Sequence, residues 1–366
     1  MTYHPPHITR LAAELEGAPD AELTVAPKST HDVASVLHHA TEKGLKVQVR
    51  GGGTRSGFGA PLPPDIVMSM ERLGEVESWV PGDLTLVVGA GARIADVETR
   101  LEAENQTAVF PEVPGASTVG GAIAAGAEAL RRGRLYGTRE RILETTIVTG
   151  DGRIVRSGGR VVKNVTGYDM QKLSVGAFGS LGVVVSVCLR LWPVPPAGVT
   201  VTVDSPDQVS TIARPLAVLE ENESTRVFLW GTQEVVSALA DRLDGKSADG
   251  LDWPADPSGS YTWSLRVPPA LTSQASAQLP DDWRYLAIHG VGDIRAASDD
   301  GEGAPDLRAW AESVGGHLVV VDAPPDFHKE FDPWGSPPAG LDLQRRLIAE
   351  FDPARIINPG RLPGGI

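Results

Sequence analysis

The stretch at residues 110–126, FPEVPGASTVGGAIAAG, places the strongest constraint on how this chain can fold. A second glycine-rich stretch, GAFGSLG, follows at residues 176–182. Segments this rich in small residues do not form an ordinary packed core, but they let the backbone approach a ligand closely and present several N–H groups to it. Because clustered backbone N–H groups bind anions, the two stretches predict a site for a phosphate-bearing cofactor.

Length, charge and cysteine content limit the class of protein. The chain has 366 residues, more than one hydrophobic core usually serves, so we expect two domains. Its net charge of −14 argues against a nucleic-acid-binding surface. The single cysteine, Cys188, lies in an apolar run, is expected in a buried strand and cannot form a disulfide within the chain. With no apolar leader or membrane-spanning run, these features predict a soluble, cytoplasmic protein.

The first half of the chain predicts alternating strands and helices. A helix is expected at residues 30–44, with Ser29 or Thr30 as its N-cap and Gly44 at its end. A second helix is expected at residues 93–105, where Ile94, Val97 and Leu101 share one face. The remaining elements are strands: residues 45–50, 66–70 and 84–89, a hairpin over 142–158, and a long strand at 183–191.

The pattern changes after the WPVPP run at residues 192–196. From residue 199 to about 321, short strands alternate with expected helices at residues 208–222, 234–243 and 307–314. This alternation predicts a sheet with helices on one face, and the chain as a whole is assigned to the α+β class. A last helix is expected near residues 343–351, before the terminal run FDPARIINPGRL.

No familiar phosphate-binding motif explains the glycine stretches. No G-x-G-x-x-G lies between a strand and a helix with an acidic residue downstream, and the P-loop pattern is absent. Gly89-Ala-Gly91 alone is a weak signal. The cofactor is therefore not expected at a single helix N-terminus. Several separated glycine loops are expected to surround its pyrophosphate instead.

Five motifs together resemble the FAD-binding domain of the vanillyl-alcohol oxidase / p-cresol methylhydroxylase (PCMH-type) superfamily. They are RGGGTRS at 50–56, PGASTVGG at 114–121, Tyr136-Gly137, GAFGSLG at 176–182 and NPGRL at 358–362, in the order of that superfamily. The resemblance covers about residues 20–195 and the last 20. It implies a PCMH-type FAD-binding domain of two subdomains at 1–197, a smaller α+β cap domain at 198–340, and a C-terminal segment at 341–366 that returns to the flavin.

A further motif, KNVTGYD at residues 163–169 followed by Lys172-Leu173, resembles the E-subunit family of glycolate oxidase complexes. This resemblance implies an FAD-binding oxidoreductase subunit of a glycolate-oxidase-like 2-hydroxy-acid dehydrogenase complex. It implies as partners a larger FAD subunit and an iron–sulfur subunit, through which the cytoplasmic protein would reach the membrane periphery. The resemblance further implies that the substrate is a small 2-hydroxy acid, or that a partner subunit donates the electrons.

The resemblance also implies which residues contact FAD. The 51–56 loop should bind the pyrophosphate, residues 114–118 and 120–124 should line the flavin and ribityl side, and residues 179–184 should pack on the adenine or ribityl region, with Asn358 reaching the flavin from the chain end. Because the first loop offers no His and Cys188 lies in a strand, we expect noncovalent FAD. The cofactor-binding residues implied in this way are Arg50, Gly51, Gly52, Gly53, Thr54, Arg55, Ser56, Pro114, Gly115, Ser117, Thr118, Gly120, Gly121, Ala124, Gly126, Tyr136, Gly137, Gly179, Gly182, Val183, Val184 and Asn358.

Catalytic candidates come from a weaker resemblance. Residues 289–295, HGVGDIR, resemble the H-x-G-x-G-x-x-H region of related 2-hydroxy-acid dehydrogenases, but Arg295 occupies the second His position, so no metal site is predicted. Arg295 is a candidate to hold a substrate carboxylate. His289 and Tyr168 are the other candidates, although a buried strand position for His289 and a loop-stabilising role for Tyr168 explain them equally well.

Two other functions remain open from the sequence. The chain could be a stand-alone FAD-dependent dehydrogenase or oxidase of a small hydroxy acid or alditol, active without partners. It could instead be an assembly subunit whose flavin site is vestigial. Flavin absorbance of the purified protein distinguishes the assembly role from both flavin-dependent functions, the subunit of a complex and the stand-alone enzyme.

Overall fold

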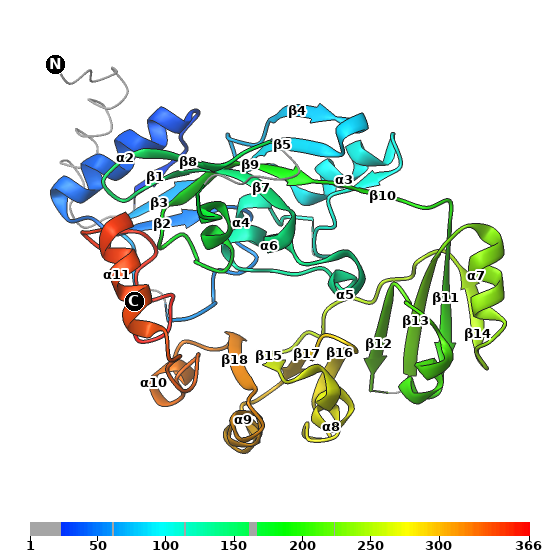
Figure 1. Ribbon diagram of the computed structural model, residues 1–366. Helices are drawn as coiled ribbons and strands as arrows, with labels where there is room; N and C mark the ends of the chain where they lie inside the picture. The colour runs from blue at the N-terminus through cyan, green and yellow to red at the C-terminus, as the bar shows by residue number, and fades with distance from the viewer. Residues whose placement is uncertain (1–22, 61, 113–114, 161–166, 223) are drawn as a thin grey trace.

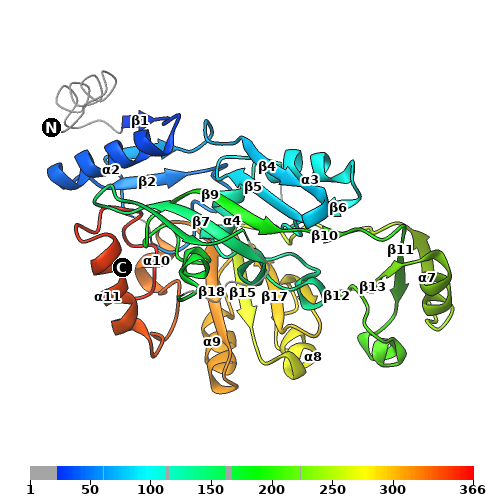
Figure 2. The same cartoon turned by 45° about the horizontal axis from the view of Figure 1, so that its top comes forward.

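The computed structural model describes residues 23–60, 62–112, 115–160, 167–222 and 224–366. Figures 1 and 2 show two small sheets from the first half of the chain lying above one large sheet from the second half. The architecture is mixed α/β. Within the described ranges, no helix is both long and apolar enough to cross a lipid bilayer.

The first sheet is parallel and has three strands in the order β1 (Leu23–Val25), β3 (Ile66–Ser69), β2 (Val47–Arg50). Helix α2 (Thr30–Lys43) packs on it through Val33 and Leu37. Both predicted ends of this helix are confirmed. The Ser29 hydroxyl accepts a hydrogen bond from the Asp32 N–H at 3.1 Å, and Gly44 ends the helix in the left-handed conformation.

The second sheet is antiparallel, with five strands in the order β4-β5-β9-β7-β8. The predicted hairpin at 142–158 is confirmed as β7 and β8, and Cys188 is buried in β9 as expected. Helices α3 and α4 pack with β5, β7 and β9 around one apolar core. The bounds are β4 (Val76–Val80), β5 (Thr85–Gly89), β7 (Ile142–Val148), β8 (Ile154–Gly158), β9 (Val183–Arg190), α3 (Ile94–Glu102) and α4 (Val119–Ala124).

Short elements connect these layers. Strand β6 (Gln106–Thr107) pairs with β10 (Trp192–Pro193), which brings the end of the first half back beside α3. The other short elements are η1 (Pro81–Asp83), α5 (Arg132–Leu135), α6 (Thr138–Arg141), η2 (Met170–Ser174), η4 (Pro269–Leu271) and α10 (Phe327–Glu330).

The large sheet has eight strands in the order β14-β11-β13-β12-β16-β17-β15-β18 and is antiparallel throughout. Figure 1 shows these strands side by side below the first half of the chain. Their bounds, with the three longer connecting helices, are β11 (Ala197–Val203), β12 (Ala217–Glu221), β13 (Ser224–Gly231), β14 (Lys246–Asp249), β15 (Tyr261–Arg266), β16 (Arg284–Ile288), β17 (Asp293–Ser298), β18 (His317–Asp322), α7 (Gln233–Ala240), α8 (Thr272–Ser276) and α9 (Ala304–Ser313).

The two faces of the large sheet have different neighbours, as side-chain alternation along a strand requires. On β16, Ala287 packs into the cluster that contains α8 and α9. Its neighbours Leu286 and Ile288 point the other way and pack with Leu130 and Leu135 of the first half. The prediction of helices on one face is therefore confirmed, and the opposite face packs against residues 129–135, which follow the first glycine-rich stretch.

The predicted helix at 208–222 is wrong. The structure has a short 3-10 turn, η3 (Pro206–Thr211), followed by strand β12. Pro215 lies in the middle of the expected helix and cannot donate a backbone hydrogen bond there. Arg214, directly before it, is in the left-handed region at φ 56°. The apolar residues that follow alternate between the two faces of the sheet, which the helical interpretation overlooked.

The C-terminal segment begins with α11 (Leu341–Phe351) and then runs beside the first sheet. The Val47 N–H donates to the Ile356 carbonyl at 2.8 Å, and the Asn358 N–H donates to the Val47 carbonyl at 2.9 Å. These bonds form one parallel bridge beside β2, between Val47 and Ile357. Residue 358 is thereby brought next to the loop that follows β2.

Candidate functional site

A cavity lies where the loop after β2, the start of α4 and the C-terminal segment meet, and we call it the glycine cavity. Twelve of the residues predicted from sequence line it. They are Arg50, Gly51, Gly52, Gly53, Thr54, Arg55, Ser56, Ser117, Thr118, Gly121, Ala124 and Asn358. Ala122, which also lines it, falls within the predicted range 120–124, whereas Val49, Ala125, Ala127, Phe178 and Arg361 were not predicted.

The loop after β2 approaches the start of α4 so closely that two positions require glycine. A Cβ on Gly51 would overlap the Thr118 hydroxyl, and one on Gly52 would overlap the Ala116 carbonyl oxygen. The Thr118 hydroxyl also caps α4 by accepting from the Gly121 N–H at 3.3 Å. The two backbone segments therefore form a close-walled cradle, the arrangement that the small residues predicted.

The glycine cavity is positively charged. Three arginines line it, Arg50, Arg55 and Arg361, and its described lining contains no Asp or Glu. Arg361 donates to the carbonyl oxygens of Arg55 at 3.1 Å and Ser56 at 2.8 Å, which secures the loop. Burial lowers the pKa of the Arg55 guanidinium, and nearby Arg295 lowers it further. A cavity with guanidinium groups, hydroxyls and close backbone fits the diphosphate of FAD.

Asn358 connects three parts of this site. Its side-chain oxygen accepts from the Val49 N–H at 2.8 Å, and its side-chain nitrogen donates to the Phe178 carbonyl at 2.7 Å. Its backbone is in the left-handed region at φ 46°, a conformation that Asn adopts more readily than most residues. Both of its polar side-chain atoms are used to hold the protein together.

A second, narrower cavity adjoins the glycine cavity and shares six lining residues with it, among them Gly51, Gly121 and Asn358. Its further lining includes four other predicted residues: Gly120, Gly179, Val183 and Val184. None of the residues that line either cavity is His, Cys or Tyr. This composition is consistent with noncovalent binding of a cofactor.

Six predicted cofactor-binding residues lie elsewhere or cannot be placed. Gly126 and Gly137 line a polar cavity with Arg132, Arg139 and Arg266 at the large sheet. Tyr136 is 60% exposed and lines a surface pocket. Gly182 forms the tight turn before β9 and, like Gly115, lies outside the linings of both cavities. Pro114 lies outside the described residues.

The three catalytic candidates do not come together. Arg295, on β17, is ion-paired with Asp256 at 2.5 Å and donates to the Glu128 carbonyl at 2.7 Å. His289 contacts the Glu220 carboxylate at 2.7 Å and lines the same surface pocket as Tyr136. Tyr168 is 90% exposed. None of the three lines the glycine cavity. Arg295 lies near it, because its charge helps to lower the pKa of Arg55, which lines the cavity.

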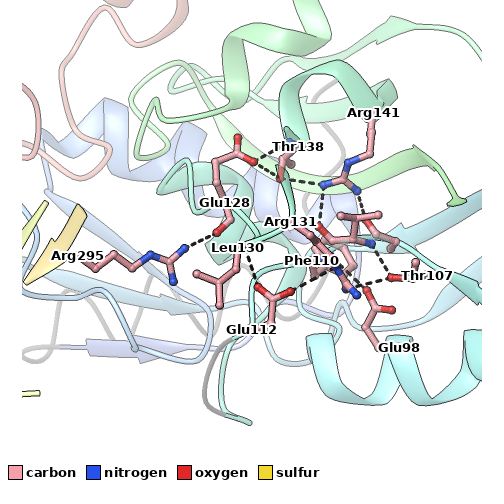
Figure 3. A network of polar contacts seen from close by, with 12 residues as sticks. Glu98, Thr107, Phe110, Glu112, Glu128, Leu130, Arg131, Thr138, Arg141 and Arg295 are labelled. Atoms are coloured by element: carbon pink, nitrogen blue, oxygen red, sulfur yellow. Dashed lines mark hydrogen bonds and ion pairs between the residues drawn. The ribbon is translucent and has the colours of Figure 1, made fainter. Parts of the chain in front are cut away.

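A polar network that joins α3 to residues 107–141 was not foreseen from the sequence (Figure 3). Arg141 donates to the Ala108 carbonyl and, at 2.8 Å, to the Val109 carbonyl. Glu98 accepts from the Phe110 N–H at 3.2 Å, and burial raises the pKa of this carboxyl. Val109 is in the left-handed region at φ 54°, which is strained for a β-branched residue. The network therefore holds the segment that leads into the glycine stretch.

Figure 3 also shows how this network reaches the large sheet. Glu128 accepts from the Thr138 N–H at 2.9 Å through its carboxylate and from Arg295 through its backbone carbonyl. Glu112 accepts from the Leu130 N–H at 2.9 Å and pairs with Arg131. The basic run at residues 131–141 therefore has three arginines that make contacts within the protein, namely Arg131, Arg132 and Arg141.

Comparison with known proteins agrees with this geometry. The model of the family described as FAD binding domain matches residues 21–158. Glycolate oxidase subunit GlcE of Escherichia coli (strain K12) is 24% identical over 333 residues, covering 86% of this chain and 91% of that protein. D-lactate dehydrogenase of Archaeoglobus fulgidus is 38% identical over 176 residues, covering 47% of this chain and 39% of that protein.

The solved structure of an alkyldihydroxyacetonephosphate synthase has a TM-score of 0.66 at 15% identity, covering 92% of this chain and 75% of that one, and it shows the shared fold. The chain spans less than two fifths of the D-lactate dehydrogenase that it matches, and that match covers about half of the chain. The family model, the cradle and the relatives agree on one cofactor. Residues 21–158 are therefore a PCMH-type FAD-binding domain, and the chain is a flavoprotein, related to hydroxy-acid oxidoreductases, with FAD as its cofactor.

Proposed function

We propose that this protein is the FAD-binding subunit of a glycolate-oxidase-like complex that oxidises a small 2-hydroxy acid. The observation that carries the proposal is the length of the match to glycolate oxidase subunit GlcE, which extends over 86% of this chain and 91% of that subunit. The match to D-lactate dehydrogenase, in contrast, stops after about half of this chain. A larger FAD subunit and an iron–sulfur subunit are the proposed partners, in the cytoplasm or at the membrane periphery.

The residues of the glycine cavity have defined tasks in this proposal. Bound FAD supplies the two-electron acceptor for the oxidation. The 51–56 loop and Thr118 hold the diphosphate, with Arg50, Arg55 and Arg361 offsetting its charge. Asn358 and Phe178 form the wall at the C-terminal side. Val183 and Val184 line the narrow end of the site, where we place the adenine or ribityl group.

The catalytic candidates support a subunit role more than an independent enzyme. Arg295 already uses two of its nitrogens, on Asp256 and on the Glu128 carbonyl. His289 is held by Glu220, whose other carboxylate oxygen accepts from the Tyr285 hydroxyl at 2.8 Å. A hydroxyl proton and a substrate carboxylate would need groups free to take them. We therefore propose that a partner subunit carries the better-formed 2-hydroxy-acid site.

The decisive experiment compares the isolated chain with the chain expressed alongside its proposed partners. The purified chain should show the visible absorbance of bound flavin and turn over glycolate or D-lactate only weakly with an artificial electron acceptor. Affinity-tagged protein should copurify with a second flavoprotein and an iron–sulfur protein. Turnover by the isolated chain comparable to that of the complex would make it a stand-alone dehydrogenase instead. Absence of flavin after reconstitution with FAD would leave an assembly role.

A further inference from the structure

The surface pocket that Tyr136 and His289 line has no task in the proposed function. It has a volume of about 370 Å³ and lies where α5 of the first half meets strands β12 and β16 of the large sheet (Figure 1). Its most buried lining is apolar, since Leu130, Leu216 and Ile288 are each at most 3% exposed. We call it the arginine pocket, because two arginines line it as well. An apolar pocket of this size can accept a bulky side chain of another molecule.

The arginine pocket carries uncompensated positive charge. Arg134 of α5 and Arg214, which precedes β12, are exposed, and neither side chain forms an ion pair or a hydrogen bond with the described part of the chain. No Asp or Glu is among the described residues that line the pocket. The whole chain, in contrast, has a net charge of −14. The pocket is therefore a basic area on an acidic protein, which attracts and orients an acidic partner.

The carboxylates that bond to residues of the lining are already paired inside the protein. Glu220 contacts the His289 ring nitrogen at 2.7 Å. Glu112 accepts from the Leu130 N–H at 2.9 Å and pairs with the Arg131 guanidinium at 3.3 Å. These contacts fix the pocket wall, and they leave the two exposed arginines without a counter-charge.

Tyr136 is held in a strained conformation without being buried. Its backbone lies at φ 64° and ψ 156°, a region that is almost confined to glycine. Its ring centroid lies 6.3 Å from that of Trp192, yet the residue is 60% exposed, so burial does not offset the strain. Strained residues gather at binding sites, and Tyr and Arg are among the residue types enriched at protein interfaces. An exposed Tyr136 beside two unpaired arginines therefore indicates a protein-binding surface.

We propose that the arginine pocket is the docking site of a partner subunit, which inserts a bulky apolar side chain into the pocket and pairs flanking carboxylates with Arg134 and Arg214. The inference rests on the proposed function, which supplies the partner subunits, and adds the surface that one of them contacts. Small-molecule sites enclose most of their ligand, whereas both arginines here are exposed, so the geometry favours a protein segment over a small anion. A partner docked here contacts both halves of the chain, since α5 and the large sheet both line the pocket.

The test uses the FAD-loaded chain, coexpressed with the two proposed partner subunits and purified as the complex. Mass photometry on dilution measures the dissociation constant of this complex. The double variant Arg134→Glu/Arg214→Glu should weaken the complex about hundredfold, tenfold for each reversed charge, while the isolated variant keeps its flavin absorbance and melting temperature. Raising NaCl from about 50 to about 500 mM should weaken the wild-type complex, and the double variant should lose most of this dependence.

Arg72→Glu/Arg346→Glu is the matched control, because both arginines are exposed, lie outside the pocket and form no ion pair with other described residues. It changes the net charge by the same amount and should leave the dissociation constant unchanged. Arg134→Lys/Arg214→Lys keeps the charge and should retain most of the affinity, which separates loss of charge from poor folding.

A complex of wild-type affinity in Arg134→Glu/Arg214→Glu overturns the docking site and leaves the proposed function intact. Absence of any complex with the wild-type chain overturns the proposed function and the docking site together. Calorimetry of the isolated chain with phenyl phosphate tests the small-anion alternative. One-to-one binding of phenyl phosphate that the double variant loses, with the complex unaffected, would assign the pocket to a small anion and overturn the docking site.

Discussion

The side-chain amide of Asn358 donates a hydrogen bond to the backbone carbonyl of Phe178 at 2.7 Å, although 180 residues of chain separate them. The same side chain accepts from the Val49 N–H at 2.8 Å. The Phe178 wall of the glycine cavity is thus joined to β2, the strand that enters the 51–56 loop. Asn358 sets the distance between these two parts of the cavity.

Asn358→Ala is expected to weaken both stability and cofactor binding. The substitution leaves the Val49 N–H and the Phe178 carbonyl without this partner, at a cost of about 1–3 kcal/mol for each group that stays dry. Denaturant unfolding and the flavin-to-protein absorbance ratio measure the two effects. Asn105→Ala is the control, because Asn105 also has positive φ but is exposed. Equal losses in both variants would mean that the backbone conformation, and not the bridge, matters.

Gly121→Val is expected to abolish FAD binding. A Cβ at Gly121 would lie 3.0 Å from the Thr118 hydroxyl oxygen and within the glycine cavity, so the valine methyl groups would occupy cofactor space. The visible absorbance of the purified variant is the measurement. Gly82→Val is the control, because a Cβ there meets nothing within 4 Å. A yellow Gly121→Val protein with normal thermal stability would place the cofactor elsewhere.

Arg295→Ala is expected to leave FAD bound while destabilising the contact between the large sheet and residues 127–132. Arg295 is 16% exposed and links Asp256 to the Glu128 carbonyl, so we expect a loss of about 2 kcal/mol in the free energy of unfolding. Arg284→Ala, which removes an exposed ion pair, should cost under about 1 kcal/mol. Flavin loss in Arg295→Ala would show that this residue supports the cofactor, and a change in turnover alone would assign it to substrate.

Cys188 is expected to be unreactive in the folded protein. It is 1% exposed in β9, and burial raises the pKa of its thiol to about 11. Because the thiolate is the reactive form, a thiol reagent at mildly alkaline pH should label the native chain slowly and the denatured chain completely. Cys188→Ser provides the blank, since the chain has one cysteine. Rapid labelling of native protein would mean that the five-stranded sheet opens readily.

Asp352→Asn is expected to change the pH dependence of stability. Burial raises the pKa of the Asp352 carboxyl, and an acid with a raised folded-state pKa contributes stability that is lost as pH rises through that pKa. The asparagine should therefore gain stability relative to wild type as pH increases from about 4 to neutral, since the unfolded value is about 3.9. It can still accept from the Ile357 N–H, the 2.8 Å bond made by wild type.

Unfolding titrations across this pH range provide the measurement for Asp352→Asn. Asp282→Asn, at an exposed position, should follow the wild-type curve. A constant offset between Asp352→Asn and wild type at every pH would assign the effect to a hydrogen bond and not to charge.

The sequence predicted those features of the fold that depend on neighbouring residues, such as helix ends and close backbone approaches. Ser29 and Gly44 mark the ends of α2 because capping depends on neighbouring backbone groups. Gly51 and Gly52 were expected at the cofactor because close approach leaves no room for a side chain. Contacts made across long separations left no such signal. The bond from Arg361 to the Ser56 carbonyl spans 305 residues, and Phe178 in the cavity wall resembles any buried aromatic.

The errors of the sequence analysis have specific causes. The segment at 208–222 contains enough apolar residues for either a helix or a strand, and Pro215 prevents a continuous helix there. Tyr168 lies within the motif at 163–169 that resembles glycolate oxidase E subunits, yet its side chain is 90% exposed. A motif specifies which residues occur together in a family, whereas side-chain direction depends on the turn that presents them. Arg295 could not be placed without knowing that Asp256 lies opposite it.

The bridge between Val47 and Ile357 has a consequence for biosynthesis. A ribosome delivers the loop at 51–56, the glycine stretch and the large sheet long before it delivers residue 358. The glycine cavity of a nascent chain therefore stays open on one side until residue 358 has been synthesised. If this cavity holds FAD as proposed, we expect a chain truncated before α11 to be colourless.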